Sequence, residues 1–268
     1  MGDQVRVEKD GPVTTVILNR PEVRNAVDPE TGAKLVEAFL RFERDQEASV
    51  AVFFGDHGAF CAGGDLKALS GDDGETWLNR LHFPADDETP PPPGPLGPSR
   101  LALSKPTIAA VAGPAVAGGM ELALWCDVRV MEEDAYFGVY CRRWGIPLID
   151  GGTVRLPRLV GQGRALEIIL TGRKVPAEEC ERIGLCEYVV EDGQCRAKAE
   201  ELAQQIAQFP QACVRADRRA AIRQNGLPLR DALVRESYNG QPLLREGGIA
   251  GAARFKDGLG RHGDFGKI

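Results

Sequence analysis

The segment Gly113-Pro-Ala-Val-Ala-Gly-Gly-Met-Glu-Leu-Ala-Leu-Trp-Cys-Asp127 carries the strongest signals for the fold of this chain. Its glycine pair, Gly118 and Gly119, lets the backbone turn tightly and lets another molecule approach it closely. The mostly apolar residues 120–126 are typical of the first turns of a buried helix. Backbone amides at a helix N-terminus carry partial positive charge, which suits an oxygen that becomes negative during a reaction. The stretch therefore predicts a turn, a buried helix and a site for developing negative charge.

Glu121 is the only charged residue between Lys105 and Asp127. A carboxylate one helical turn from the glycine amides could move a proton during a reaction. An acidic residue in the first turn of a helix could equally do no more than complement the helix dipole. The sequence favours neither interpretation over the other, and Glu121 is a candidate catalytic acid or base.

Short apolar segments on the N-terminal side predict strands joined by a helix. Residues 5–7 and 13–18 are expected to form two strands around a turn. Asp28 fits an N-cap and Pro29 the first position of a helix. The wholly apolar run 50–54 is typical of a buried parallel strand, so strand, helix and strand predict an α/β fold. Further strands are predicted over 107–111, 128–131, 135–138 and 187–190.

The apolar strand is followed by a second glycine-bearing loop, Gly58-Ala-Phe-Cys-Ala-Gly-Gly-Asp-Leu-Lys67. Its glycine spacing fits neither a Walker phosphate loop nor a dinucleotide-binding fingerprint. Gly63 and Gly64 can still offer a bare amide to a ligand oxygen. Ligands of open α/β folds bind beyond the carboxyl ends of the strands, where both glycine segments are predicted to lie. We therefore expect the amides of Gly64 and Gly118 to form an oxyanion hole for a thioester or ester carbonyl.

The rest of the chain predicts one unusual loop and a helical C-terminal part. Residues 84–98 are rich in proline and are expected to be an exposed, semi-stiff surface loop, tolerated as an insertion. From Thr153 onward the pattern is mostly helical, with amphipathic helices expected over 194–209, 212–224 and 230–244. Because these last helices cannot make a large core alone, we expect them to pack on a neighbouring subunit.

The composition is that of an ordinary globular protein, with 43% hydrophobic and 27% charged residues. The net charge of −6 argues against non-specific nucleic-acid binding. No apolar run is long enough to span a bilayer, and the N-terminus has no apolar segment of a secretion signal. The seven cysteines are scattered without the spacing of zinc ligands. We therefore expect a cytoplasmic protein with reduced thiols, no metal, and no nucleic-acid or membrane partner.

A series of short motifs runs through nearly the whole chain. The motifs are Asn19-Arg-Pro21 with Asn25-Ala26, Gly58-Ala-Phe-Cys-Ala-Gly-Gly-Asp-Leu66, Lys105-Pro-Thr-Ile-Ala-Ala-Val-Ala-Gly113, Ala117-Gly-Gly-Met-Glu-Leu-Ala123, Cys126-Asp127, Phe137-Gly138, Gly151-Gly-Thr-Val-Arg-Leu156, Leu170-Thr-Gly-Arg173, Ala177-Glu-Glu179 and Ile183-Gly-Leu185. In their joint order and spacing they resemble the crotonase superfamily, also called the enoyl-CoA hydratase/isomerase family.

The resemblance implies an α/β fold, a crotonase-like spiral of β-β-α turns with a C-terminal helical region. Residues 1–193 would form the spiral core, and residues 194–268 would form the helical region used for trimerisation. The protein would be a homotrimer or a hexamer. The resemblance also implies a CoA thioester as substrate, with no metal and no other cofactor.

The resemblance also assigns site residues. It places Gly64 and Gly118 at the two oxyanion-hole amides, and Glu121 at the first catalytic glutamate. Other matched positions lie along the CoA path, at its phosphates, or where the chain closes over the nucleotide. These CoA-binding candidates are Arg24, Ala62, Gly63, Asp65, Leu66, Phe255 and Lys256.

The chain departs from the family pattern at one catalytic position. A hydratase of this family carries a second glutamate four residues after the phenylalanine that Phe137 matches, and Cys141 stands there instead. Hydration uses two carboxylates around one water, and a mostly neutral thiol is a poor replacement for either. We interpret Cys141 as a small, half-buried residue rather than a nucleophile.

Asp150 could compensate for the missing glutamate. Divergent relatives such as the dienoyl-CoA isomerases carry a working aspartate in this loop, just before the pair that Gly152-Thr153 matches. Asp150 could equally cap the helix expected from Thr153. The nearest cations in sequence, Arg142 and Arg143, could pair with Asp150 or face solvent.

The resemblance favours an enoyl-CoA hydratase that adds water to a double bond through a thioester enolate. Glu121 would be the principal acid or base, and Asp150 a second proton carrier. One alternative is an enoyl- or dienoyl-CoA isomerase, or a CoA-thioester hydrolase, that uses the same two carboxylates. The alternative from another class is a non-catalytic assembly subunit that binds a CoA thioester.

Overall fold

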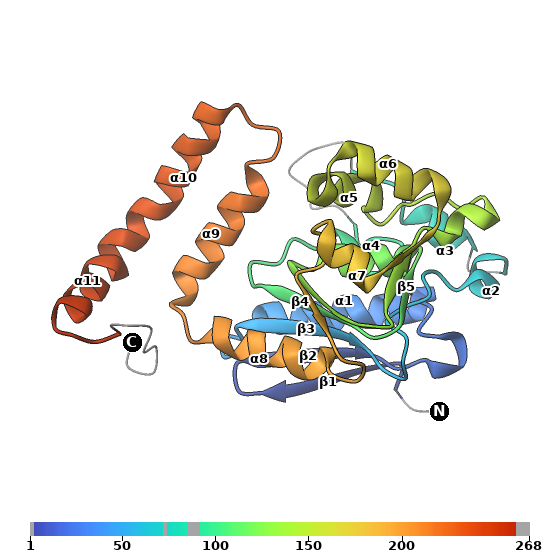
Figure 1. Cartoon of the computed structure of the whole chain (residues 1–268), viewed down its shortest axis with the longest axis horizontal. Helices are drawn as coiled ribbons and strands as arrows, with labels where there is room; N and C mark the ends of the chain where they lie inside the picture. The colour runs from blue at the N-terminus through green and yellow to red at the C-terminus, as the bar shows by residue number, and fades with distance from the viewer. Residues whose placement is uncertain (1–2, 72–73, 85–91, 261–268) are drawn as a thin grey trace. The chain divides into compact units, whose positions relative to one another are not determined.

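The computed structural model describes residues 3–71, 74–84 and 92–260, and its N-terminal part is built on one six-stranded sheet (Figure 1). The first two strands form an antiparallel hairpin, and every later strand pairs in parallel with its neighbour. The strand order is β1-β2-β3-β4-β6-β9, and crossover connections join the parallel strands, as expected for an α/β fold. The strands are β1 (Val5–Asp10), β2 (Val13–Leu18), β3 (Val50–Gly55), β4 (Thr107–Val111), β6 (Val128–Glu132) and β9 (Tyr188–Val190).

A second sheet of three short strands stands beside the first. It contains β5 (Pro114–Val116), β7 (Tyr136–Gly138) and β8 (Lys174–Pro176). The strand β7 pairs in parallel with β5 and antiparallel with β8. Of these three strands the sequence predicted only β7, because β5 and β8 each contain a proline, which argues against a strand.

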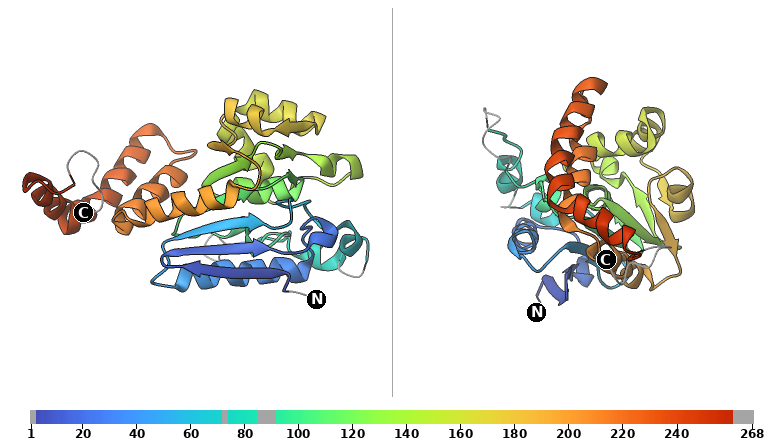
Figure 2. Two further views of the ribbon diagram at one scale, coloured as in Figure 1. Left: turned by 60° about the horizontal axis from the view of Figure 1, so that its bottom comes forward. Right: turned by 90° about the vertical axis from the view of Figure 1, so that its left-hand side faces the viewer.

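The first long helix confirms the sequence prediction of a capped start. Helix α1 (Pro29–Arg44) begins after Asp28, whose Oδ1 atom accepts a hydrogen bond from the amide of Thr31 at 2.7 Å. Its apolar face is buried, with Leu35 and Phe39 fully enclosed. The helix packs along β1 and β2 (Figure 2).

The remaining helices of the N-terminal part are mostly short. They are η1 (Pro21–Val23), α2 (Leu66–Leu69), α3 (Gly74–Asn79), η2 (Pro98–Arg100), α4 (Gly118–Trp125), η3 (Tyr140–Trp144), α5 (Gly152–Val160), α6 (Gln162–Thr171), α7 (Ala177–Arg182) and α8 (Cys195–Ala207). Every residue of α4 is buried, as the apolar sequence after the glycine pair predicts. The helix begins at Gly118, two residues before the expected start, so both glycines belong to its first turn.

The prediction of an exposed loop over residues 84–98 is wrong for its C-terminal end. Residues 94–98 are buried, whereas residues 85–91 lie outside the described part of the chain. Gly97 adopts a φ of +98°, and a Cβ added there would lie 2.4 Å from the carbonyl oxygen of Gly32. The turn is therefore pressed against the start of α1, and glycine is needed for both its conformation and its close approach.

The chain divides into two compact units, Met1–Ala203 and Gln204–Ile268. The second unit contains α9 (Gln211–Arg223), α10 (Leu229–Leu243), a short π-helical turn (Leu244–Gly248) and α11 (Ile249–Lys256). Helices α9 and α10 pack together, and the amide of the Asn239 side chain donates to the carbonyl of Ala216 at 2.8 Å. The predicted boundary at residue 194 precedes α8, and the role assigned to the C-terminal region stays a prediction.

Among the described residues, no helix combines the length and the apolar composition that crossing a bilayer requires.

Candidate active site

One cavity in the first unit brings together most of the candidate residues, which lie in helices and loops outside the strands of the first sheet. Much of its wall is apolar or aromatic, and Trp77, Tyr140 and Trp144 contribute rings to it. The buried carboxylates of Glu121 and Asp150 also line the cavity, and a few polar groups in a largely apolar wall are typical of a small-molecule site. The predicted residues that line the cavity are Ala62, Gly64, Leu66, Gly118, Glu121, Cys141 and Asp150.

The two glycine segments converge, as the sequence predicted. A Cβ added to Gly63 would lie 3.1 Å from the backbone nitrogen of Gly118. Gly64 forms a parallel bridge with Val27, in which the amide of Val27 donates to Gly63 and the amide of Asp65 donates to Val27. In this pattern the amide of Gly64 itself points away from Val27. Gly64 and Gly118 both line the cavity.

Side chains of the cavity wall require glycine at both positions. A Cβ on Gly64 would lie 2.2 Å from the Trp77 ring, and a Cβ on Gly118 would lie 2.0 Å from Cδ1 of Leu96. The residue before α4, Ala117, has a φ of +53° and a ψ of −125°, which is a strained conformation for any residue but glycine. Strain of this kind persists only where the surrounding structure fixes the backbone, here immediately before the Gly118 amide.

Glu121 lies in the first turn of α4 and is only 2% exposed. Its Oε1 atom accepts hydrogen bonds from the backbone amides of Asp150 at 2.9 Å and Gly152 at 2.7 Å. Burial, followed by the negative charge of Asp150, raises the pKa of Glu121 to about 7, although these amides oppose the shift. A carboxyl group with this pKa can both accept and release a proton near neutral pH.

Asp150 is also buried, and its Oδ1 atom accepts hydrogen bonds from the amide of Leu96 at 3.1 Å and from the hydroxyl of Ser99. Burial raises the pKa of Asp150, while the Ser99 and Leu96 donors and the positive charges of Arg100 and Arg155 act in the opposite direction. The site therefore contains two neighbouring acids that differ in their hydrogen-bond donors.

Two sequence interpretations of Asp150 are corrected by this arrangement. Helix α5 starts after Gly151 with no capping side chain, so Asp150 is not its N-cap. Arg142 and Arg143 are exposed and form no ion pair with Asp150 within the described residues. The cation that contacts Asp150 is Arg155, whose Nη1 atom donates to the Asp150 carbonyl at 2.9 Å.

Cys141 lies in η3 and lines the same cavity. It is more buried than the half-buried residue expected from the sequence. Burial and then the negative charge of Glu121 raise the pKa of the Cys141 thiol. The thiol is therefore neutral around pH 7 and does not supply the second carboxylate of a hydratase.

The CoA-binding candidates of the first unit surround the glycine loop. The carbonyl of Arg24 accepts a hydrogen bond from the amide of Ala62 at 3.0 Å, and the Arg24 side chain is exposed. Leu66 lines the cavity and is also exposed. Ala62 and Leu66 therefore line the cavity, and Arg24 is bound to Ala62 through its backbone.

The carboxylate of Asp65 has structural partners. It forms an ion pair with Arg20 at 3.3 Å and accepts a hydrogen bond from the amide of Lys67 as the N-cap of α2. Phe255 and Lys256 lie on α11 of the second unit, where Phe255 is 61% exposed.

Several residues around the carboxylates were missed by the sequence analysis. Leu96 and Ser99 belong to no motif, and they reach Asp150 only because the chain folds back over about fifty residues. Arg155 is part of the motif Gly151-Gly-Thr-Val-Arg-Leu156, but nothing in that motif pointed to its contact with Asp150, five residues earlier. The turn that carries Leu96 and Ser99 could have been predicted from the spacing of Gly94 and Gly97, because two close glycines in a proline-rich segment favour a tight turn.

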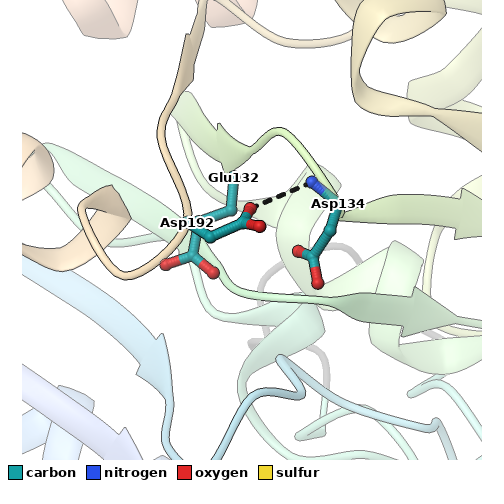
Figure 3. A group of neighbouring side chains, drawn as sticks. All are labelled: Glu132, Asp134 and Asp192. Carbon is teal, nitrogen blue, oxygen red and sulfur yellow. Dashed lines mark hydrogen bonds between the residues drawn. The ribbon is translucent and has the colours of Figure 1, made fainter.

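A separate acidic group contains Glu132, Asp134 and Asp192 (Figure 3). Within the described part of the chain, it is the only set of three potential ligands whose atoms lie within 4.8 Å of one another. Asp192 accepts a hydrogen bond from the amide of Asp134 at 3.1 Å, and Glu132 accepts one from the amide of Cys195 at 3.4 Å. These bonds join the turn after β6 to the start of α8, which accounts for the position of the group without an ion.

Comparison with known proteins gives a consistent result. The sequence model of the enoyl-CoA hydratase/isomerase family matches residues 8–239. An enoyl-CoA hydratase of Mycobacterium tuberculosis is 38% identical over 77% of this chain and 75% of its own length. A carnitinyl-CoA dehydratase of Salmonella typhi is 38% identical over the same shares of the two chains. A crystal structure of an enoyl-CoA hydratase from M. tuberculosis superposes with a TM-score of 0.85 at 31% identity, covering 95% of this chain and 96% of that chain.

Proposed function

The chain belongs to the enoyl-CoA hydratase/isomerase family, and we propose that it adds water to the double bond of an enoyl-CoA. The relatives named hydratase and dehydratase carry the same reaction in its two directions, which supports this choice within the family. The observation that carries the proposal is that Glu121 and Asp150 line the same cavity as Gly64 and Gly118.

The two glycine amides would bind the thioester oxygen. Attack of water on the β-carbon of an enoyl thioester moves negative charge onto that oxygen and forms an enolate. Two preorganised amides next to a largely apolar wall stabilise such a charge far better than bulk water does. The strained start of α4 at Ala117 and the bridge between Gly64 and Val27 fix the two amides before the substrate arrives.

The two carboxyl groups would carry the two protons of hydration. One proton leaves the attacking water, and one is delivered to the α-carbon of the enolate. Glu121 is the principal acid or base because its pKa of about 7 suits transfer in either direction. Asp150 is the second carrier and replaces the carboxylate that Cys141 cannot supply. The reaction uses water and a CoA thioester, so we expect it to need no metal and no other cofactor.

The CoA moiety would leave the cavity along the exposed edge of the glycine loop. Arg24 is the candidate for its phosphates, and Ala62, Gly63, Asp65 and Leu66 would contact the pantetheine and adenine part. The structural partners of Asp65 restrict that residue to backbone contacts. Phe255 and Lys256 remain candidates for closing over the nucleotide in a cytoplasmic trimer or hexamer.

Isomerisation of an enoyl-CoA or dienoyl-CoA double bond is the second candidate. The observation in its favour is the neutral Cys141 thiol beside Glu121, where a hydratase would hold water with a second carboxylate. Moving one proton between two carbons needs the oxyanion hole and an acid or base, but no bound water. Thioester hydrolysis with the same carboxylates and a non-catalytic CoA binder are further alternatives.

The test is turnover of crotonyl-CoA, followed by loss of the absorbance of the conjugated thioester. We expect Glu121→Gln to lower kcat at least about 10³-fold, the scale of a lost general acid or base. Glu133→Gln, which changes an exposed glutamate, is the matched control and should keep the wild-type rate. Turnover that survives Glu121→Gln but is lost in Asp150→Asn would move the chemistry to Asp150. Tight CoA binding without turnover of any enoyl- or dienoyl-CoA would contradict the proposal in favour of a binder.

A further inference from the structure

The turn formed by residues 94–100 lies directly against the carboxylate of Asp150. Gly94 and Gly97 exchange two backbone hydrogen bonds of 2.8 Å, which close the turn. A Cβ added to Gly94 would lie 1.8 Å from Oγ of Ser99 and 2.6 Å from Oδ1 of Asp150. Only glycine at position 94 therefore allows the hydroxyl and the carboxylate to meet.

Two donors of this turn end on a single oxygen of Asp150. The amide of Leu96 and the hydroxyl of Ser99 both donate to Oδ1. Ser99 is completely buried, so its hydroxyl has no exchange with bulk water. Two donors on one oxygen fix the plane of the carboxylate and favour its ionised form.

The backbones on both sides of this contact are tied together by one guanidinium group. Arg155 donates from Nη2 to the carbonyl of Ser99 at 2.6 Å and from Nη1 to the carbonyl of Asp150 at 2.9 Å. A planar guanidinium that bridges two carbonyls sets their separation closely. Ser99 and Asp150 are therefore held in position by their backbones as well as by their side chains.

We propose that Ser99 is a positioning residue for Asp150: it holds Oδ1 so that the other carboxylate oxygen is presented to the substrate cavity. The turn 94–100 then forms part of the active site, although its residues 94–98 belong to the segment 84–98 that was expected to be a tolerated surface insertion. The proposal depends on the proposed function in one respect, namely that Asp150 transfers a proton during the reaction. The hydrogen bond itself can be tested without turnover.

The groups that surround Asp150 define the expected effect. Glu121, Arg100, Arg155 and the Cys61 thiol are the titratable or charged groups that interact with it. Because the Ser99 hydroxyl lowers the pKa of Asp150, its removal raises that pKa. The other groups stay in place in a Ser99 variant, so the change reports on the hydroxyl alone.

The experiment compares Ser99→Ala, Ser99→Cys and Asp150→Asn in the full chain. Ser99→Ala should lower kcat at least about tenfold, the equivalent of one charge-assisted hydrogen bond, with KM changed less than about twofold. The limb of the pH–rate profile that Asp150→Asn abolishes should move to higher pH. Ser99→Cys keeps the side-chain length and a weak donor, so it should fall between alanine and the wild type. Ser49→Ala, at another buried serine, is the matched control and should behave as wild type.

A second measurement separates failure of this proposal from failure of the proposed function. The titration of the Asp150 carboxyl is followed by 13C NMR and assigned with Asp150→Asn, and Ser99→Ala should shift it to higher pH even if no enoyl-CoA is turned over. A titration that stays in place in a folded Ser99→Ala protein overturns the proposal. If Ser99→Ala lowers kcat but leaves the limb of the pH–rate profile at its wild-type position, Ser99 contributes only packing, and the proposal is overturned as well.

Discussion

Glu121 and Asp150 show how one site can give two carboxyl groups different tasks. Oε1 of Glu121 accepts hydrogen bonds from two backbone amides. The Asp150 carboxylate accepts hydrogen bonds from a hydroxyl and a backbone amide, and it lies near the positive charges of Arg100 and Arg155. Burial raises both pKa values; the Ser99 and Leu96 donors and two guanidinium charges oppose the rise at Asp150, whereas backbone amides oppose it at Glu121. Neighbouring acids in unequal environments are a common basis for acid–base division of labour.

The coupling between the two acids gives a prediction for Asp150→Asn. The negative charge of Asp150 helps to raise the pKa of Glu121, so its removal should lower that pKa. Any limb of the pH–rate profile near pH 7 should therefore move to lower pH in the residual activity. A limb that stays at its wild-type position would show that the two carboxyl groups do not interact.

Gly64→Ala adds a single methyl group at the proposed oxyanion hole and tests its geometry. The added Cβ would meet the buried ring of Trp77 at 2.2 Å, so the loop or the ring must move. We expect a loss of stability of about 1–3 kcal/mol and a fall in kcat/KM of at least tenfold, because a displacement of about 1 Å can cost 100-fold in rate. Gly163→Ala, with open space around it in α6, is the control and should keep both properties. Equal behaviour of the two variants would contradict the assignment of Gly64.

Among the elements, the turn 94–100 shows most clearly what the sequence could not predict. Asp28 and Pro29 predicted the start of α1, and the apolar runs predicted β3 and β4, because these signals act over a few residues. The strands β5 and β8 were missed because each contains a proline, which argues against a strand. The burial of the proline-rich turn depends on contacts with α1, about sixty residues earlier, and with Asp150, about fifty residues later. Contacts over such separations leave no local pattern in the sequence.

The same limit applies to the site. Motifs predicted that Gly64, Gly118, Glu121 and Asp150 would come together, and they line one cavity. No local pattern predicted Ser99, because its partner is fixed by tertiary structure alone.

Gly97→Ala tests whether the turn supports the site. Gly97 (φ +98°, ψ −104°) and Gly161 (φ +78°, ψ +157°) both have backbone conformations that L side chains rarely adopt, so alanine costs roughly 1–3 kcal/mol of backbone strain at either position. At Gly97 the new Cβ would also lie 2.4 Å from the carbonyl oxygen of Gly32, whereas Gly161 has open space. We expect Gly97→Ala to lose more unfolding free energy than Gly161→Ala and to lose activity, since the turn carries Leu96 and Ser99. Similar activity in both variants would contradict a role for the turn.

For the whole molecule, the raised pKa of Glu121 links catalysis to stability. The pKa is about 7 in the folded state and 4.5 without the fold, so the folded protein binds more protons between these pH values. The contribution of Glu121 to stability is therefore complete below about pH 4.5 and is lost as the pH rises through about 7.

Glu121→Gln should consequently be more stable than the wild type at pH 8, by up to about 3 kcal/mol, with the difference vanishing near pH 4. Urea denaturation at both pH values measures it. A variant that is less stable at pH 8 would show that the buried carboxylate is stabilised by the fold, which contradicts the raised pKa.

The second unit leads to a prediction about assembly. It exposes large apolar side chains, including Leu229, Tyr238 and Ile249. Surfaces of this kind mark contacts with other chains. We expect light scattering to give the mass of three or six chains, and Leu229→Asp with Tyr238→Asp to lower it. A wild-type monomer would contradict the predicted trimer.

A crystal structure with an unreactive acyl-CoA bound would test the proposed oxyanion hole most directly. We expect the thioester oxygen to lie about 3 Å from the backbone nitrogens of both Gly64 and Gly118, with the acyl carbons facing Glu121 and Asp150. A thioester oxygen that contacts only one of these amides, or a CoA bound outside this cavity, would contradict it.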